Sequence, residues 1–213
     1  KVRATGGVIG EVGRMHTVGN RERVSELVAI CDEYQLAVGE DAAESLGSQY
    51  KGQHTGTFGQ MGAFSFNGNK TITCGGGGAI VTNDETLARR AKHITTTAKV
   101  PHQWEYDHDC VGFNYRMPNL NAALACAQLE QIEAVLENKR ELAKEYAAFF
   151  ESIGVSFVQE PSQAHSNYWL NALILDNREQ RDQFLQETNS QGVMTRPVWK
   201  LMHHLKLYVN AQR

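Results

Sequence analysis

Three short apolar segments in the first hundred residues limit most strongly the folds that this chain can adopt. They cover residues 36–40, 63–66 and 78–82, and each is followed directly by a polar residue. Each is too short for a typical helix but long enough for a buried strand. Short strands separated by helical stretches are typical of an open α/β sheet, which is the fold class that we expect.

Helical patterns precede and follow these segments. Residues 21–34 have apolar side chains at helical spacing behind Asn20, a suitable N-cap, and a second helix is expected from Asn83–Asp84 to about His93. Residues 118–151 continue a helical period for so long that a bend or break is expected.

The remaining stretches suggest two regions of different character. Residues 1–19 are rich in glycine and are interpreted as loop, and residues 95–110 as a long polar and aromatic loop. From Gly154 onward the pattern becomes α+β. Strands are expected at 155–158, 168–175 and 193–196, and a helix at 178–189. We therefore place a domain boundary near Gly154, with one domain over 1–153 and a smaller one over 154–213.

An acid and a lysine stand beside the first two expected strands. Asp41 follows the first strand, at the carboxyl end where open α/β sheets bind ligands. Lys70 follows the second strand in a turn of Asn and Gly residues, just before Gly75–Gly78. Pyridoxal phosphate chemistry needs this pair: a lysine that binds the aldehyde, and an acid that keeps the ring nitrogen protonated. Glu40 is the alternative acid, and a lysine in a turn is more often a surface charge.

Four motifs in this order resemble one enzyme family. They are Glu40-Asp41-Ala42-Ala43-Glu44, Phe64-Ser65-Phe66 ahead of Lys70, the run Gly75–Gly78, and Gly112-Phe113-Asn114-Tyr115-Arg116-Met117. Together they resemble the DegT/DnrJ/EryC1/StrS aminotransferases, pyridoxal phosphate enzymes that aminate nucleotide-linked keto sugars. The resemblance runs from about His16 to about Tyr208. It implies part of the large domain of the fold type I aminotransferases, followed by part of a smaller α+β C-terminal domain.

The resemblance also implies roles for individual residues. Lys70 would carry the cofactor, and Asp41 would pair with its ring nitrogen. Glu44, one helical turn beyond Asp41, would lie near the cofactor and the transferred amine. The alternative for Glu44 is a helix residue that faces solvent.

Three further residues are implied to bind anionic groups. Ser65 would bind the cofactor phosphate, and Asn114 would reach the phosphate in the neighbouring subunit of a homodimer with shared active sites. Arg116 would bind anionic groups of the substrate, or else pair with a structural carboxylate.

The implied reaction is transamination of a nucleotide-linked 4-keto-6-deoxy sugar with L-glutamate as amine donor. UDP-4-keto-6-deoxy-N-acetylhexosamine is the expected substrate, on a route to cell-surface sugars. One alternative is a sugar dehydratase of the same family, although those enzymes replace the lysine with His. Another is an inactive or partial fragment, because segments that the family has at both ends are missing. On that view the 213-residue chain alone is expected to have little or no activity.

Composition excludes several other classes of function. A net charge of −3 and the lack of a long apolar run argue against nucleic acid or a membrane as partner. Four scattered cysteines favour a reducing compartment, so the cytoplasm is expected. The glycine run lacks the spacing of a nucleotide-binding loop. His102, His108 and Cys110 match no standard metal-site spacing, and no metal is expected.

Overall fold

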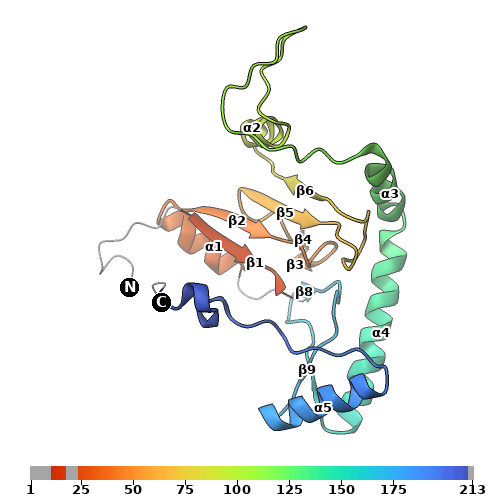
Figure 1. The fold of residues 1–213 in the computed structure, drawn as a ribbon. Helices are drawn as coiled ribbons and strands as arrows, with labels where there is room; N and C mark the ends of the chain where they lie inside the picture. The colour runs from red at the N-terminus through yellow and green to blue at the C-terminus, as the bar shows by residue number, and fades with distance from the viewer. Residues whose placement is uncertain (1–10, 18–23, 211–213) are drawn as a thin grey trace.

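The computed structural model describes residues 11–17 and 24–210. Its centre is a four-stranded sheet in the order β1-β2-β5-β6 (Figure 1). The strands are β1 Glu11–Met15, β2 Ala37–Asp41, β5 Met61–Ser65 and β6 Gly78–Val81. The first three are parallel and β6 is antiparallel to β5. The three strands expected from the apolar segments are thus confirmed, and so is the α/β class.

Strand β1 corrects the interpretation of residues 1–19 as loop. All five of its residues pair with β2, from Glu11 opposite Ala37 to Met15 opposite Asp41. A segment with two glycines around Val12 has no clear period of its own, so pairing with β2 determines its conformation. The expected loop over residues 1–10 and the expected N-cap Asn20 lie outside the described residues.

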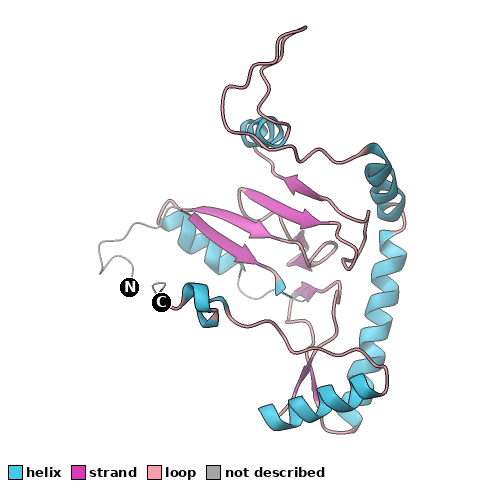
Figure 2. Ribbon diagram, viewed as in Figure 1, coloured by secondary structure: helices cyan, strands magenta, loops and turns pink. Residues whose placement is uncertain are grey.

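The helices of the first part follow the expected pattern. Helix α1 covers Val24–Glu33 and α2 covers Glu85–Thr95. The Asp84 side chain caps α2 by accepting hydrogen bonds from the backbone N–H groups of Thr86 and Leu87. The long helical stretch is broken, as expected, into α3 Asn119–Leu129 and α4 Ile132–Ser152. Figure 2 shows α4 leading from the end of the main sheet to the region of α5.

The C-terminal part has fewer strand residues than expected. Strand β7, Ser156–Phe157, pairs with β9, Leu173–Ile174, and α5 covers Arg178–Ser190. The strand expected over 168–175 is therefore much shorter. Residues 193–196 are not a strand, and the side chains of Thr188 and Asn189 bond to Thr195 there. Two short 3-10 helices follow, Met202–His204 and Lys206–Tyr208.

A second sheet connects residues from both sides of Gly154. Its order is β4-β3-β8, with β3 Gln49–Tyr50, β4 Gln53–His54 and β8 Ala164–His165. None of these short strands was expected from the sequence. The domain boundary near Gly154 stays a prediction, but residues beyond it pair directly with the first part of the chain.

The acidic pair at the end of β2 is divided between the two faces of the main sheet. Glu40 is 3% exposed, and its Oε2 lies 2.8 Å from Nε2 of His16. The same carboxylate accepts the backbone N–H groups of Gly56, Phe58 and Gly59 at 3.0, 2.5 and 2.7 Å. Burial would raise the pKa of Glu40, but the hydrogen bonds from His16, Gly59 and Gly56 outweigh it and lower the pKa to about 2. Asp41, the next residue, is exposed on the opposite face.

Two glycines allow the loop over residues 56–59 to lie close to the main sheet. A Cβ added to Gly59 would collide with the carbonyl oxygen of Val38, and one added to Gly62 would collide with the backbone of Gly56. The loop over residues 56–59 is thereby held directly above the Glu40 carboxylate.

A cluster of apolar residues packs the main sheet against the start of the long helical stretch. Its buried members are Phe66, Ile72, Cys74 and Ala125. None of the helices in residues 11–17 and 24–210 is both long enough and apolar enough to cross a bilayer.

We predict that Glu40→Gln destabilises the protein while Asp41→Asn does not. The first change leaves buried donors facing a neutral amide and should lower the free energy of unfolding by about 3 kcal/mol. The second, on the exposed face, should change it by less than about 0.5 kcal/mol. Urea denaturation at pH 7 measures both.

The pH dependence of the free energy of unfolding checks whether the ionised Glu40 carboxylate is the cause of this difference. Because the pKa of Glu40 lies below its ordinary value of 4.5, its contribution should be complete above that pH and disappear toward pH 2. Equal losses of stability in the two variants at pH 7 would contradict the structural role of Glu40.

Candidate active site

The lysine singled out from the sequence lies in a loop that begins at the carboxyl end of β5. The N–H group of Asn67 donates to Oγ of Ser65 at 3.3 Å, and the N–H group of Lys70 donates to the carbonyl of Asn67 at 3.1 Å. The loop returns to β6, where the N–H group of Phe66 bonds the carbonyl of Gly77 at 2.9 Å. Lys70 is half-buried there.

Asp41 and Ser65 lie on the same face of neighbouring strands. The register pairs Asp41 with Ala63, and Ser65 is two residues further along β5. Because alternate residues of a strand share a face, the carboxylate and the hydroxyl project from the same side. Oδ1 of Asp41 accepts the backbone N–H group of Ala43 at 3.1 Å. Of the two acids, Glu40 is buried and makes structural hydrogen bonds, whereas Asp41 is exposed.

The segment after Asp41 is not the helix that was expected around Glu44. The N–H group of Ser45 bonds the carbonyl of Ala42, and that of Ser48 bonds the carbonyl of Ser45, so the chain makes successive turns. Glu44 is half-buried, and its carbonyl accepts a hydrogen bond from the Asn167 side chain. The role of Glu44 near a cofactor remains a prediction.

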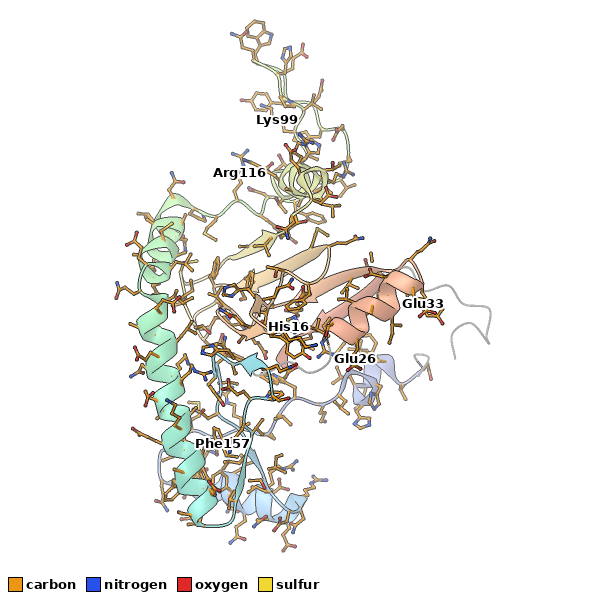
Figure 3. All side chains as sticks on the ribbon, turned by 180° about the vertical axis from the view of Figure 1, so that it is seen from behind. His16, Glu26, Glu33, Lys99, Arg116 and Phe157 are labelled. Carbon is orange, nitrogen blue, oxygen red and sulfur yellow. The ribbon has the colours of Figure 1, made fainter. Side chains whose placement is uncertain are left out.

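Asn114 and Arg116 lie beyond β6, on the connection between α2 and α3, and Arg116 is labelled in Figure 3. Both are exposed. Arg116 lines a cavity of about 870 Å³ together with Ala63, Ile80 and Lys92. Since Ala63 shares a face with Asp41 and Ser65, this cavity reaches the same side of the sheet. Asn114 is paired with Thr96 instead, at the base of a hairpin.

That hairpin is the long loop expected over 95–110, and it extends away from the rest of the molecule (Figure 1). Lys99 pairs with His108 along it. Trp104 and Tyr106 near its tip are 69% and 77% exposed.

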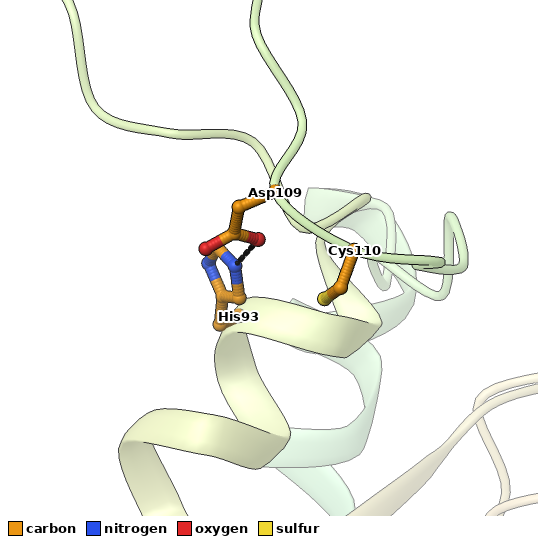
Figure 4. A group of neighbouring side chains, drawn as sticks. All are labelled: His93, Asp109 and Cys110. Carbon is orange, nitrogen blue, oxygen red and sulfur yellow. Dashed lines mark hydrogen bonds and ion pairs between the residues drawn. The ribbon is translucent and has the colours of Figure 1, made fainter.

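His93, Asp109 and Cys110 meet where the hairpin joins α2 (Figure 4). Nε2 of His93 donates to Oδ1 of Asp109 at 2.6 Å. This hydrogen bond, despite partial desolvation and with help from the Cys110 thiol, lowers the pKa of Asp109. The possible ligand atoms lie within 4.8 Å of one another, so the group could hold a metal ion. Because a hydrogen bond already joins His93 on α2 to Asp109 on the hairpin, we interpret the cluster as a latch for the hairpin.

The metal ligands considered from the sequence are not assembled as a set. Nδ1 of His108 bonds the carbonyl of Thr97 at 2.7 Å, and Nδ1 of His102 accepts the N–H group of Glu105 at 3.0 Å. Of the three, only Cys110 belongs to the cluster at the hairpin base.

Sequence reasoning missed the residue that contacts the Lys70 side chain. The Lys70 Nζ atom lies 4.3 Å from the centroid of the Trp169 ring. The indole N–H group of Trp169 donates to the carbonyl of Asn69 at 2.6 Å. Nothing local in the sequence indicates a contact between residues one hundred positions apart.

Comparison with known proteins identifies related chains. Residues 10–213 match the family described as the DegT/DnrJ/EryC1/StrS aminotransferase family. The protein named "Putative pyridoxal phosphate-dependent aminotransferase EpsN" from Bacillus subtilis (strain 168) is 40% identical over 191 residues, which are 89% of this chain and 49% of that relative. GDP-perosamine synthase from Escherichia coli O157:H7 is 38% identical over 194 residues, or 91% of this chain and 53% of that enzyme.

A solved structure has the same arrangement of elements. The crystal structure of a DegT DnrJ EryC1 StrS aminotransferase from Brucella abortus superimposes with a TM-score of 0.89 at 25% identity. The match covers 98% of this chain and 55% of that one. The chain thus spans about half the length of the relatives that it matches.

We predict that Asp109→Ala loosens the hairpin without unfolding the sheet. Amide hydrogen exchange of Val100 and Phe113 should become about tenfold faster, because the link from the hairpin to His93 is lost. Asp107→Ala, an exposed change on the same hairpin, should leave exchange at both positions near the wild-type rate. Equal rates in the two variants would contradict the latch.

Proposed function

This chain belongs to the DegT/DnrJ/EryC1/StrS aminotransferase family, and on that premise we propose that it forms the cofactor-binding part of a sugar transaminase. The cofactor is pyridoxal phosphate, the amine donor is L-glutamate, and the acceptor is a nucleotide-linked 4-keto-6-deoxy sugar. We propose UDP-4-keto-6-deoxy-N-acetylhexosamine as that acceptor and cell-surface sugars as the destination of the product. The names of the relatives support a pyridoxal phosphate enzyme and a sugar substrate.

One observation carries the proposal: the strand that buries Glu40 exposes Asp41. With Glu40 occupied by His16 and the backbone of the loop over 56–59, only Asp41 of the pair can meet a ligand on the open face. Ser65 is on that face, and the loop of Lys70 starts directly after it. A carboxylate to accept from the ring nitrogen, a hydroxyl to donate to the phosphate and a primary amine to bind the aldehyde are the groups that a phosphorylated pyridine aldehyde requires, so these residues fit the cofactor.

Each residue would act according to its chemistry. Pyridoxal phosphate supplies an aldehyde that binds amines and a ring that withdraws electrons from the carbon beside the bound nitrogen. Asp41 would keep a proton on the ring nitrogen, and the Ser65 hydroxyl would donate to the phosphate. The Lys70 amine would bind the aldehyde and, once displaced, move a proton from the α-carbon of glutamate.

We propose that the residues beyond β6 serve the substrate and a second subunit. Arg116 would bind phosphate groups of the sugar nucleotide from the cavity that reaches Ala63. Asn114, exposed beside the extended hairpin, would donate to the cofactor phosphate in the partner of a homodimer with shared active sites. Four free cysteines support placing the enzyme in the cytoplasm.

We predict that Lys70 is the residue that pyridoxal phosphate labels. After borohydride reduction, peptide mapping should find the label at Lys70, and Lys70→Arg should remove it. Lys51→Arg, a change in another turn of the chain, should leave the label in place. A label that persists in Lys70→Arg would refute the assignment.

We predict that Asp41→Asn slows transamination without preventing cofactor binding. An amide cannot keep the ring nitrogen protonated, so single turnover with L-glutamate should slow on the order of 100-fold. The label at Lys70 should remain. Glu33→Gln, an exposed change on α1, is the matched control and should turn over at the wild-type rate.

Amination of UDP-linked and of GDP-linked 4-keto-6-deoxy sugars should be measured with L-glutamate as amine donor, using the full-length protein that contains this sequence. Amination of the UDP-linked sugar supports the proposal. Amination of the GDP-linked sugar alone would overturn the proposed substrate but leave the transaminase. Failure of L-glutamate to react at all would overturn the reaction itself.

A further inference from the structure

We propose that Asn167 and Trp169 are positioning residues for Lys70. In this proposal they hold the backbone of the turn over residues 67–71, and the Trp169 indole provides a fixed resting position for the Lys70 amine. The proposal rests on the proposed function, because that function gives Lys70 its task.

Asn167 joins the two segments that follow the strand ends. Its side chain is buried, with the residue 1% exposed. The side-chain amide lies 3.0 and 2.9 Å from the carbonyls of Glu44 and Leu46, in the segment after Asp41. It also lies 3.2 Å from Oγ1 of Thr71, the residue after Lys70. One side chain therefore fixes the relative position of both segments.

Trp169 holds the other side of the same turn. It is 5% exposed, and its indole N–H group bonds the carbonyl of Asn69. The Lys70 amine lies over the ring, as a cation does in a cation–π contact. The residue is held on both sides, because the backbone N–H group of Trp169 donates to Oδ1 of Asn167 at 2.9 Å and the ring stacks on Trp199 with 6.1 Å between ring centroids.

The backbone between these two residues is strained. Tyr168 has a φ of 42°, in the left-handed region that side chains rarely adopt. Such a conformation persists only where surrounding interactions enforce it. The hydrogen bonds of Asn167 and Trp169 lie on either side of this residue, and their targets are the segment after Asp41 and the Lys70 turn.

The hairpin supplies an internal reference for the test. Lys99 lies 3.7 Å from the centroid of the Tyr106 ring, so it makes the same kind of contact in a different part of the molecule. Competitive acetylation of the cofactor-free protein, read by mass spectrometry, compares Lys70 with Lys99.

Trp169→Leu should raise the acetylation of Lys70 relative to Lys99 by about threefold, because the amine loses its resting position. Trp169→Phe keeps an aromatic face and should return the ratio to near the wild-type value. Tyr106→Leu should change the ratio in the opposite direction. An unchanged ratio in folded Trp169→Leu would overturn the role of the indole.

Amide exchange tests the hold on the turn. Trp169→Phe removes the bond to Asn69 and Asn167→Ala removes the bond to Thr71. Exchange in residues 67–71 should therefore become about tenfold faster in both variants, while that of α2 stays unchanged. The proposal would be overturned if exchange became faster throughout the chain, or if the exchange rates in residues 67–71 did not increase. Trp169→Phe replaces one aromatic ring by another, so it carries this test if the Leu variant does not fold.

Neither measurement requires bound cofactor. If wild-type Lys70 takes no pyridoxal phosphate label, the proposed function fails, while acetylation and exchange still decide whether Asn167 and Trp169 hold the turn.

Discussion

The buried carboxylate of Glu40 is the interaction on which the arrangement of this edge of the sheet depends. It brings together three separate parts of the chain: His16 after β1, the end of β2, and the loop that precedes β5. A charge inside a protein is stable only when hydrogen bonds replace its water, and here a side chain and three backbone N–H groups do so. Since neighbouring residues of a strand face opposite ways, fixing Glu40 inward also directs Asp41 outward.

Local patterns predicted the parts of the fold that local forces determine. The three apolar strands and the cap at Asp84 follow from residue types at short spacing, and the break between α3 and α4 was expected from the length of the helical stretch. Strand β1 could not be predicted, because its sequence, which has no clear period, becomes a strand only by pairing with β2. The expected helical turn at Glu44 was wrong, since Asn167 and the turns after Ala42 determine that segment instead.

The candidate site also has parts that local sequence predicts and parts that it does not. The placement of Asp41 at a strand end, and of Lys70 in a turn after the next strand, could be predicted from their neighbours in sequence. The contacts of Lys70 with Trp169 could not, because no pattern within either segment refers to the other. The dependence of the lysine turn on residues beyond position 160 also means that the two regions distinguished in the sequence are not independent in their chemistry.

The alternation of Glu40 and Asp41 makes strand β2 unequally tolerant of different kinds of genetic change. A substitution at Val38 alters one set of packing contacts. Loss of a single codon within the strand would shift the residues beyond it to the other face of the sheet. The Asp41 carboxylate would then face the buried site that Glu40 now occupies. The Glu40 carboxylate would face solvent, away from the backbone N–H groups that stabilise it. In related proteins, substitutions should accordingly be found within this strand. Insertions and deletions between His16 and Ala42 should be confined to the connecting segments.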